Sequence, residues 1–360
     1  MLVLVVSDFH LAKGRFLANG QINIFEDFFE DDRFQEFVEY YSTGKFYWHD
    51  VHLVLNGDIF NLLQVPINGI FNHLMDEEWV IEALKVIHKG HRSFFESLKK
   101  FLSTPNKKMS FIVGNHDNGM AFEGAQNLMK NWVGDKLEFA FNININGVYI
   151  EHGHRFEVIN TVPENEYFVE GPNGKKILNL PWGSLFCISV LPTLKKERPF
   201  IDKIRPLSMY FRWSFFNDLP YFLKTAIMLL EYFIKTNFTP YVKLNRNFKT
   251  TLKLLKQITI YPRYIRMART IMKEHPDVHT VVMGHTHLCE WGRFPLGKMY
   301  FNTGTWNSIP SLDAAMHESI TKLTYVFIDL DQKNNTVRDA SLNVWMGKWR
   351  PYREEYSVNT

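Results

Sequence analysis

Four short apolar runs, each ending at a polar residue, constrain the fold of this 360-residue chain more than any other feature. They occupy Met1–Val6, Val51–Leu55, Met109–Val113 and Val278–Met283. Unbroken runs of this length, rich in β-branched residues, are typical of strands that are buried on both faces of a sheet. Charged and apolar residues recur at helical spacing between them, most clearly over Asp76–Leu102. Strands that alternate with helices predict an α/β sheet with crossover connections.

Two further segments indicate that the sheet structure is mixed rather than wholly parallel. Residues 137–151 show alternating apolar positions around an Asn-Gly turn, which predicts an antiparallel hairpin. Residues 323–345 predict a second hairpin in the same way. From about residue 160 to residue 269 the strand signal fades and helical patterning dominates. We interpret this stretch as a helical insertion between two core strands.

The length fits about two folding units or one enlarged α/β domain. The two cysteines, Cys187 and Cys289, exclude a disulfide-rich scaffold and a zinc site built from cysteine alone. The first apolar run is too short for a signal peptide or a membrane span. Lys224 and Glu231 interrupt the most apolar later stretch, Leu219–Ile234. We therefore expect a cytoplasmic protein, either free or peripheral on the inner face of the cell membrane.

The charge of the chain is unevenly distributed. Between Lys175 and Arg269 there are 18 lysines and arginines but 4 acidic residues, a net charge of +14, so that with +3 overall the remainder carries −11. A basic segment in an otherwise acidic protein predicts an anionic partner such as a phosphate group, a nucleic acid or an anionic lipid. The alternative is a solvated helical face that acidic surface elsewhere balances. Basic residues interleave with large apolar ones, as at 211–216, which makes nucleic acid the weaker candidate.

Polar side chains able to bind metal follow the four apolar runs and the first hairpin. They are Asp8 and His10, Asp58, Asn115 and His116, His152 and His154, and His285 and His287. One such histidine alone is more often structural than functional. Five clusters that each follow a strand favour a shared site, because ligands in open α/β folds gather at the carboxyl ends of strands.

Together these clusters resemble the signature of the calcineurin-like metallophosphoesterase family. The matching motifs, in the family's order, are Asp8-x-His10, Gly57-Asp58, Gly114-Asn115-His116-Asp117, His152-Gly153-His154 and Gly284-His285-x-His287. The resemblance covers about residues 1–155 and 275–350. It implies an α/β fold, the four-layer αββα metallophosphoesterase sandwich with a long helical insertion. The core is then expected over 1–159 and 270–360, with 160–269 as a helical, basic and aromatic cap or lid.

The resemblance also implies a dinuclear metal centre with seven protein ligands. One cation would be held by Asp8, His10, Asp58 and His287, and the other by Asp58, Asn115, His152 and His285. Asp58 would bridge the two cations, because a carboxylate offers two oxygens and enough charge for both. Ligation by nitrogen and oxygen without thiolate suits Mn²⁺, the favoured identity, or Fe²⁺ or Zn²⁺, and disfavours cuprous ions.

In such a centre the cations would present a shared hydroxide to phosphorus and neutralise the phosphoryl oxygens, which gives a metal-dependent phosphoesterase. His116 matches the family's catalytic histidine and would protonate the leaving group or stabilise its oxyanion, with Asp117 orienting the ring. Asn61 departs from the family pattern, in which many members carry an acidic residue at this place. Asn61 and His154 are expected beside the centre or against the substrate, with a purely structural role for His154 left open.

The C-terminal motif at 284–306 is similar to that of the branch that includes UDP-2,3-diacylglucosamine hydrolases, where a helical insertion occupies the same place. A lipid-linked pyrophosphate is therefore the expected substrate. The apolar stretch Leu219–Ile234 could pack internally, line an acyl-chain groove or enter a membrane interface. Basic residues that could meet anionic head groups follow it. They are Lys235, Lys243, Arg246, Lys249, Lys253 and Lys256.

Two other functions remain open from the sequence. The lipid-pathway hydrolases typically carry arginine where this chain has His116, so the first alternative is a phosphomonoesterase or nucleotide phosphodiesterase with a restrictive cap. The second is a metal-stabilised scaffold without activity that binds membranes or protein partners through residues 175–269. The oligomeric state has no signal in the sequence.

Overall fold

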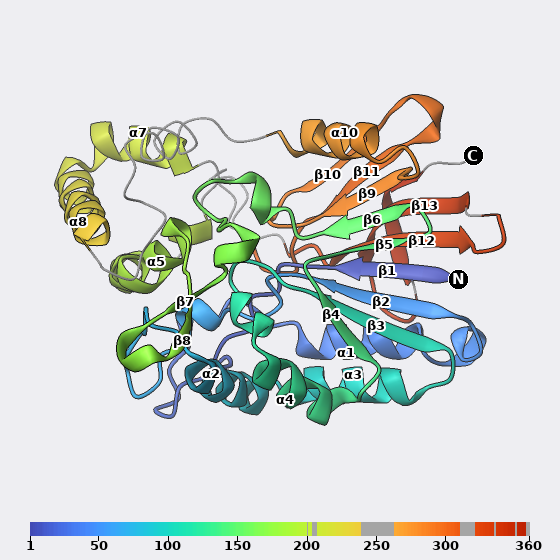
Figure 1. Cartoon of the computed structure of the whole chain (residues 1–360), viewed down its shortest axis with the longest axis horizontal. Coiled ribbons are helices and arrows are strands. Elements are labelled where there is room, and N and C mark those ends of the chain that lie inside the picture. The colour runs from blue at the N-terminus through green and yellow to red at the C-terminus, as the bar shows by residue number, and fades with distance from the viewer. Residues whose placement is uncertain are drawn as a thin grey trace.

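The structure is a computed structural model that describes residues 1–199, 201–203, 207–238, 263–309, 321–334, 336–349 and 351–357. Two sheets pack face to face, and helices cover their outer faces (Figure 1). The larger sheet has seven strands, in the spatial order β14 (Tyr352–Ser357), β13 (Thr336–Trp345), β12 (Thr324–Asp331), β1 (Leu2–Val6), β2 (Val51–Asn56), β3 (Lys107–Ile112) and β4 (Leu137–Ala140). The smaller has the order β10 (Cys289–Arg293), β11 (Met299–Thr303), β9 (Thr280–Met283), β6 (Val148–Glu151) and β5 (Asn142–Ile145).

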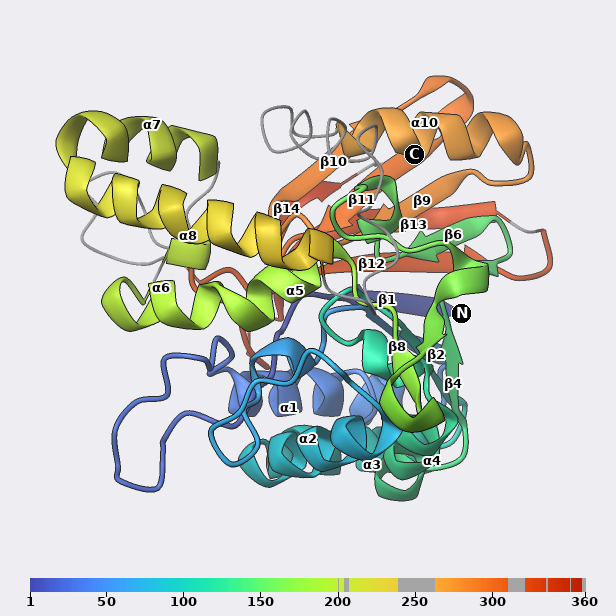
Figure 2. The same ribbon diagram turned by 60° about the vertical axis from the view of Figure 1, so that its left-hand side comes forward.

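Helices complete the outer layers of the sandwich (Figure 1). On the larger sheet these are α1 (Asp31–Tyr40), α2 (Glu77–Gly90), α3 (Arg92–Ser103) and α4 (Glu123–Val133). On the smaller sheet it is α10 (Tyr264–Glu274). Between β6 and α10 the chain forms a small hairpin and a group of helices to one side of the sandwich (Figure 2). Their bounds are β7 (Phe168–Glu170), β8 (Lys176–Leu178), α5 (Trp182–Ser189), α6 (Leu191–Glu197), α7 (Leu207–Asn217) and α8 (Leu219–Phe238).

Three apolar layers hold these four structural layers together. In β1, Leu4 packs into the layer under the helices, whereas Val3 and Val5 pack into the layer between the sheets. This alternation follows from the period of two in a strand, and it makes β1 buried on both faces. A third layer joins the smaller sheet to α10 through residues such as Val281 and Ala268. The predicted four-layer αββα sandwich is therefore confirmed.

The structure corrects two details of the predicted elements. The helical stretch 76–102 is broken at His91 into α2 and α3. The hairpin predicted over 137–151 is limited to β5 and β6, because β4 lies in the other sheet, parallel to β3. The chain passes from one sheet to the other at Phe141. The hairpin β7–β8 was not predicted, since its strands have three residues each.

A buried ion pair fixes the loop after β1 to the junction between α2 and α3. His91 is 2% exposed; its Nε2 lies 3.0 Å from the carboxylate of Glu26, and its Nδ1 lies 3.0 Å from that of Asp31. Glu26 also accepts a hydrogen bond of 2.6 Å from the backbone N–H of Gly14. Because Gly14 follows His10 closely in the chain, this pair holds a loop that carries a predicted metal ligand.

We expect the stabilising effect of His91 to depend on pH. Burial lowers the pKa of His91, but hydrogen bonds to Asp31 and Glu26 outweigh this and raise it from 6.5 to about 9. The contribution is then fully present below pH 6.5 and is lost as the pH rises through 9. Over that interval, wild type should lose up to about 3 kcal/mol of unfolding free energy relative to His91→Gln. Urea denaturation across this pH range measures the difference.

The exposed residue His73 provides the control for this experiment. The stability of His73→Gln should follow that of wild type at every pH. A constant difference between wild type and His91→Gln, independent of pH, would show that His91 is not held as a charged residue.

Candidate metal centre

The predicted polar clusters lie at the carboxyl ends of five strands. β1, β2 and β3 run parallel in the larger sheet, and β6 and β9 run parallel in the smaller one. Parallel strands end at the same edge of a sheet, so the loops that follow them meet there. His10 and His287, which are 277 residues apart in the chain, approach to 3.0 Å between their Nε2 atoms.

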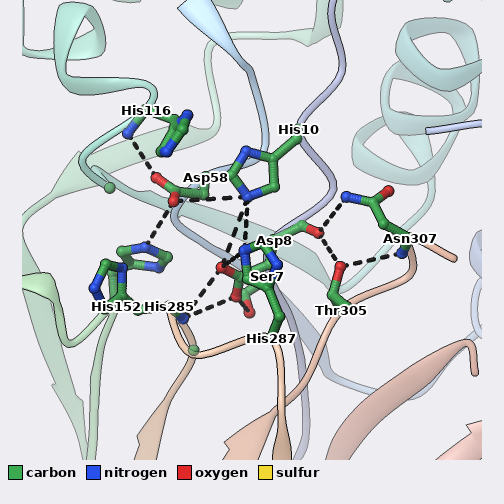
Figure 3. Close-up of polar contacts among 12 residues, drawn as sticks. Ser7, Asp8, His10, Asp58, His116, His152, His285, His287, Thr305 and Asn307 are labelled. Carbon is green, nitrogen blue, oxygen red and sulfur yellow. Dashed lines mark hydrogen bonds and ion pairs between the residues drawn. The ribbon is translucent and has the colours of Figure 1, made fainter. Parts of the chain in front are cut away.

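Three groups of side chains bring their ligand atoms within 4.8 Å of one another. They are Asp8, His10 and His287; His10, Asp58 and His116; and Asp58, His152 and His285. Because neighbouring groups share His10 or Asp58, the three form one continuous centre (Figure 3). Six of the seven predicted ligands, together with His116, therefore lie around a common point.

The carboxylate of Asp58 lies in the middle of this centre, and one of its two oxygens, Oδ2, faces the neighbouring histidines. Its Oδ1 accepts a hydrogen bond of 2.8 Å from the backbone N–H of His116. Its Oδ2 lies 3.2 Å from Nε2 of His152 and 3.8 Å from Nε2 of His10. Oδ2 therefore faces ligands that were predicted for both cations, and the bridging role of Asp58 stays a prediction.

Three buried atoms fit the predicted second cation. Oδ1 of Asn115, Nε2 of His152 and Nδ1 of His285 make no hydrogen bond within the described part of the chain. Buried polar atoms of this kind are normally satisfied, so their clustering calls for a ligand. His152 already uses Nδ1 in a 2.8 Å hydrogen bond to the carbonyl oxygen of Asn56, which leaves Nε2 for a metal. The residues present therefore fit a divalent cation.

The backbone is strained at several of the predicted ligands. Five of them have φ in the left-handed region: Asp8 (57°), His10 (55°), Asp58 (52°), His285 (70°) and His287 (61°). Residues other than glycine and asparagine rarely adopt this conformation, because the Cβ atom approaches the backbone too closely. Among the described residues, Leu296 is the one further example that is neither. Backbone strain that is concentrated in one set of residues is typical of a functional site.

Two motif glycines allow the strand ends to approach one another. A Cβ atom on Gly114 would collide with the backbone nitrogen and carboxylate of Asp58, and one on Gly284 would collide with Ser7 and Asp8. Glycine is thus required at these positions by close approach.

Hydrogen bonds hold Asp8 from several directions, through residues that the sequence analysis did not assign. Ser7 donates to Oδ2 of Asp8, and the backbone N–H of His285 donates to the same oxygen at 2.9 Å. Thr305 and Asn307 donate to the carbonyl oxygen of Asp8 (Figure 3). Thr305 lies within the C-terminal motif at 284–306, but the spacing of that motif does not indicate that Thr305 contacts Asp8.

The ring of His116 is held by Asn61. Nδ1 of His116 lies 3.0 Å from Oδ1 of Asn61, which as an acceptor places the proton on Nδ1. Asp117 was predicted to orient this ring, and that contact is wrong: its carboxylate accepts hydrogen bonds from the backbone N–H groups of Gly114 and Ile59. Asp117 therefore holds the two ligand loops together, and Asn61 positions His116.

His154 borders the second half of the centre. Its ring lies 5.5 Å from that of His152, and it lines a small pocket with Asn115, Asn118 and Asn160. Burial, together with the neighbouring His152, holds the pKa of His154 well below its usual range, so the ring is neutral. This place beside the centre suits a substrate contact, which stays a prediction.

Electrostatics in the centre favour the binding of positive charge. Burial raises the pKa of Asp8 to about 6, against the effect of His152. Burial also raises the pKa of Asp58, but His152 and His116 outweigh it and hold the pKa well below its usual range. Burial lowers the pKa of His152, yet Asp58 and Asp8 raise it to about 10. The carboxylates thus require a compensating charge, which a proton or a divalent cation can supply.

Comparison with known families agrees with this geometry. The sequence profile of the family described as calcineurin-like phosphoesterase matches residues 1–289, most of the chain. The chain belongs to the calcineurin-like phosphoesterase family. As a member, it is a metal-dependent phosphoesterase, and the three side-chain groups indicate divalent cations. A comparison with curated proteins finds no match.

A comparison with solved structures finds weak likenesses. Zinc-bound Vps29 from Entamoeba histolytica has 13% identity and a TM-score of 0.31 over 99% of this chain and 98% of its own. A predicted phosphoesterase from Streptococcus pneumoniae has 10% identity and a TM-score of 0.31 over 99% and 97%. A dimetal phosphatase from Danio rerio has 11% identity and a TM-score of 0.38 over 99% and 98%. At TM-scores this low, the likenesses carry no argument about function.

We expect Asp58→Asn to abolish binding of both cations, because Oδ2 of Asp58 faces ligands of both halves of the centre. His287→Ala should remove one cation, since His287 belongs to one half. Inductively coupled plasma mass spectrometry of Mn²⁺-loaded, desalted protein counts the ions. Glu77→Gln is the control, because Glu77 bonds the backbone of Gly124 rather than any ligand. Two ions retained by Asp58→Asn would contradict the shared position.

Proposed function

We propose that this phosphoesterase hydrolyses a lipid-linked pyrophosphate such as UDP-2,3-diacylglucosamine at a centre of two divalent cations, with Mn²⁺ as the first candidate. The observation that carries the lipid part of the proposal is an apolar outer face on α8, one helix away from the ligand Asn115.

Helix α8 is apolar on two opposite faces. Its inner face contains Tyr221, Thr225 and Tyr232, which are at most 9% exposed. Its outer face carries a row of apolar residues at helical spacing, which we call the α8 stripe. The stripe consists of Leu219, Leu223, Ile227, Leu230 and Ile234, each 46–59% exposed. A core-forming helix needs the inner face alone, so the stripe indicates a second apolar environment.

Helix α7 lies beside α8 (Figure 2) and carries exposed aromatic residues of its own. Trp213 and Phe216 are 52% and 74% exposed, and Arg212 between α7's aromatic residues is exposed as well. Exposed Trp, Phe and Leu with basic neighbours are typical of helices that lie in a membrane interface.

The basic residues that were predicted to meet anionic head groups lie outside the described part of the chain. They are the side chain of Lys235 and the whole residues Lys243, Arg246, Lys249, Lys253 and Lys256. No helix in that described part is long and apolar enough to cross a membrane.

The inner face of α8, opposite the stripe, is connected to the predicted metal centre through α5. The hydroxyl of Tyr232 on α8 donates a 2.8 Å hydrogen bond to the carbonyl oxygen of Trp182 on α5. On the same helix, Ser184 donates to the carbonyl oxygen of Asn115 at 3.4 Å. A membrane at the stripe would thus lie within two helices of the centre, which supports a substrate whose phosphate is at the membrane surface.

Two divalent cations in this centre would act as Lewis acids and lower the pKa of bound water. The chain's own residues supply the rest of the chemistry. With Nδ1 of His116 donating to Asn61, Nε2 is the atom that can hold or release a proton at the leaving group. The position of His116 beside His10 and Asp58 supports this role.

The proposed function is tested by assaying Mn²⁺-loaded enzyme with UDP-2,3-diacylglucosamine, bis-p-nitrophenyl phosphate and nucleotides. We expect the lipid substrate to have the highest kcat/KM. His116→Gln should keep both cations and lower kcat by about 10²–10⁴-fold, the usual contribution of a positioned acid. Rapid turnover of nucleotides without lipid cleavage would favour a nucleotide phosphodiesterase. No hydrolysis by metal-loaded protein would favour the scaffold alternative.

We also expect charges in the α8 stripe to abolish membrane binding. The variant carries Leu223→Glu, Ile227→Glu and Leu230→Glu, which place anions against an anionic surface. Flotation with phosphatidylglycerol vesicles measures binding, and hydrolysis of bis-p-nitrophenyl phosphate shows that the centre is intact.

A matched control introduces three glutamates elsewhere. Phe16, Ile22 and Ile70 are 61–62% exposed, as apolar and at least as accessible as the stripe residues, but they lie in loops rather than on α8. The control variant should float with the vesicles like wild type. Flotation of the stripe variant at the wild-type level would remove the membrane from the proposal.

A further inference from the structure

Glu157 is a buried carboxylate that none of the family motifs contains. It follows the His152-Gly153-His154 motif and is 5% exposed. Its Oε2 lies 3.0 Å from Nε2 of His285, a predicted ligand of the second cation. The side-chain amide of Asn160 lies 3.3 Å from the same nitrogen, and Glu157 supplies the carboxylate on the outer side of the His285 ring.

The two nitrogens of His285 are in different surroundings. Nε2 faces the acceptor Glu157, which fixes the proton on Nε2. Nδ1 is buried without a hydrogen-bond partner within the described residues, and it faces the group of Asp58 and His152. The proton on Nε2 leaves the lone pair on Nδ1 available for a cation. His152 has the same arrangement with the two nitrogens exchanged, because its Nδ1 is hydrogen-bonded to the carbonyl oxygen of Asn56.

The carboxylate of Glu157 is itself fixed at both oxygens. The hydroxyl of Tyr264 donates to Oε1 at 2.9 Å, and the side-chain amide of Asn160 donates to Oε2 at 2.6 Å. Asn160 packs closely against Gly183, where a Cβ atom would collide with its Oδ1. Asn160 lies where the chain leaves β6 for the insertion, and Tyr264 begins α10. Hydrogen bonds from Tyr264 and Asn160 therefore hold the carboxylate of Glu157 from two sides, in addition to its contact with His285.

We propose that Glu157 is a positioning residue for the second cation: it fixes the tautomer and orientation of His285 so that Nδ1 faces the metal. Outer carboxylates that hold a metal-binding histidine are a general feature of metal sites, and their removal weakens metal affinity about 10–100-fold. The inference rests on the proposed metal centre and is independent of the lipid substrate.

The test compares Glu157→Ala and Glu157→Gln with wild type. Calorimetric titration of the metal-free proteins with Mn²⁺ should show that Kd of one of the two cations rises about 10–100-fold in Glu157→Ala. Glu157→Gln should have an intermediate effect, because the amide oxygen can still accept the hydrogen bond from Nε2. Nitrogen chemical shifts in ¹⁵N-histidine-labelled apoprotein, assigned with His285→Gln, should show a proton on Nε2 of His285 in wild type and a mixture of tautomers in Glu157→Ala.

Two further variants separate the carboxylate from its surroundings. Glu151→Gln changes a buried carboxylate on β6 that pairs with Arg155, and should keep wild-type affinity. Tyr264→Phe removes one hydroxyl that holds Glu157 but leaves its contact with His285, and should change Kd less than Glu157→Ala. Equal losses in Tyr264→Phe and Glu157→Ala would assign the effect to the hydroxyl of Tyr264 rather than to the contact between Glu157 and His285, and would overturn the proposal.

Failure of this inference is distinguishable from failure of the proposed function. If wild type binds two cations and Glu157→Ala binds both with unchanged affinity and an unchanged His285 tautomer, Glu157 is not a positioning residue and the centre stands. If wild type itself binds no cation, the dinuclear centre and this inference fail together.

Discussion

One oxygen atom, Oδ2 of Asp58, determines much of this structure. It is buried and charged, and burying a charge without a partner costs several kcal/mol. The imidazoles of His152 and His10 lie 3.2 and 3.8 Å from it, and a third contact places the backbone of His116 on the other oxygen. These partners come from β1, β3 and β6, so two sheets must end at the same place for the charge to be tolerated.

The sandwich allows the strand ends to converge because its apolar core is separate from the polar site at those strand ends. Residues such as Val3, Val5 and Ile150 fill the layer between the sheets. Stability comes from that apolar packing, and the strand ends can then adopt left-handed conformations that would be unfavourable elsewhere. Local backbone preference is violated at the predicted ligands Asp8 and His285, which are held by hydrogen bonds and by close approach at Gly284. Such violations are expected at functional sites.

The sequence predicted those parts of the fold and site that depend on local pattern. Strand ends and ligand types are local, so β1 and the pair Asp8 and His10 could be predicted. Sheet membership is not local: β4 and β5 have the same alternation, yet they lie in different sheets. The orientation of His116 by Asn61 rather than by Asp117 depends on how two loops meet, which no spacing records. Glu157 was missed because its contact with His285 spans 128 residues and belongs to no repeated motif.

The environment of helix α8 could not be predicted from its sequence, for a different reason. The helix also bears on how the proposed membrane binding can be tested separately from catalysis. Its sequence is apolar around most of the helix, which is compatible with burial or with exposure; the structure divides these residues into an inner face on α5 and an outer stripe. The insertion also supplies groups that support the centre, namely Asn160 beside Glu157 and Ser184 on Asn115. Removing the whole insertion would therefore disturb the metal centre together with the proposed membrane contact. Substitutions confined to the stripe change the outer surface alone, since its side chains point away from α5, and they are the means of telling a membrane-bound hydrolase from one whose insertion only covers its site.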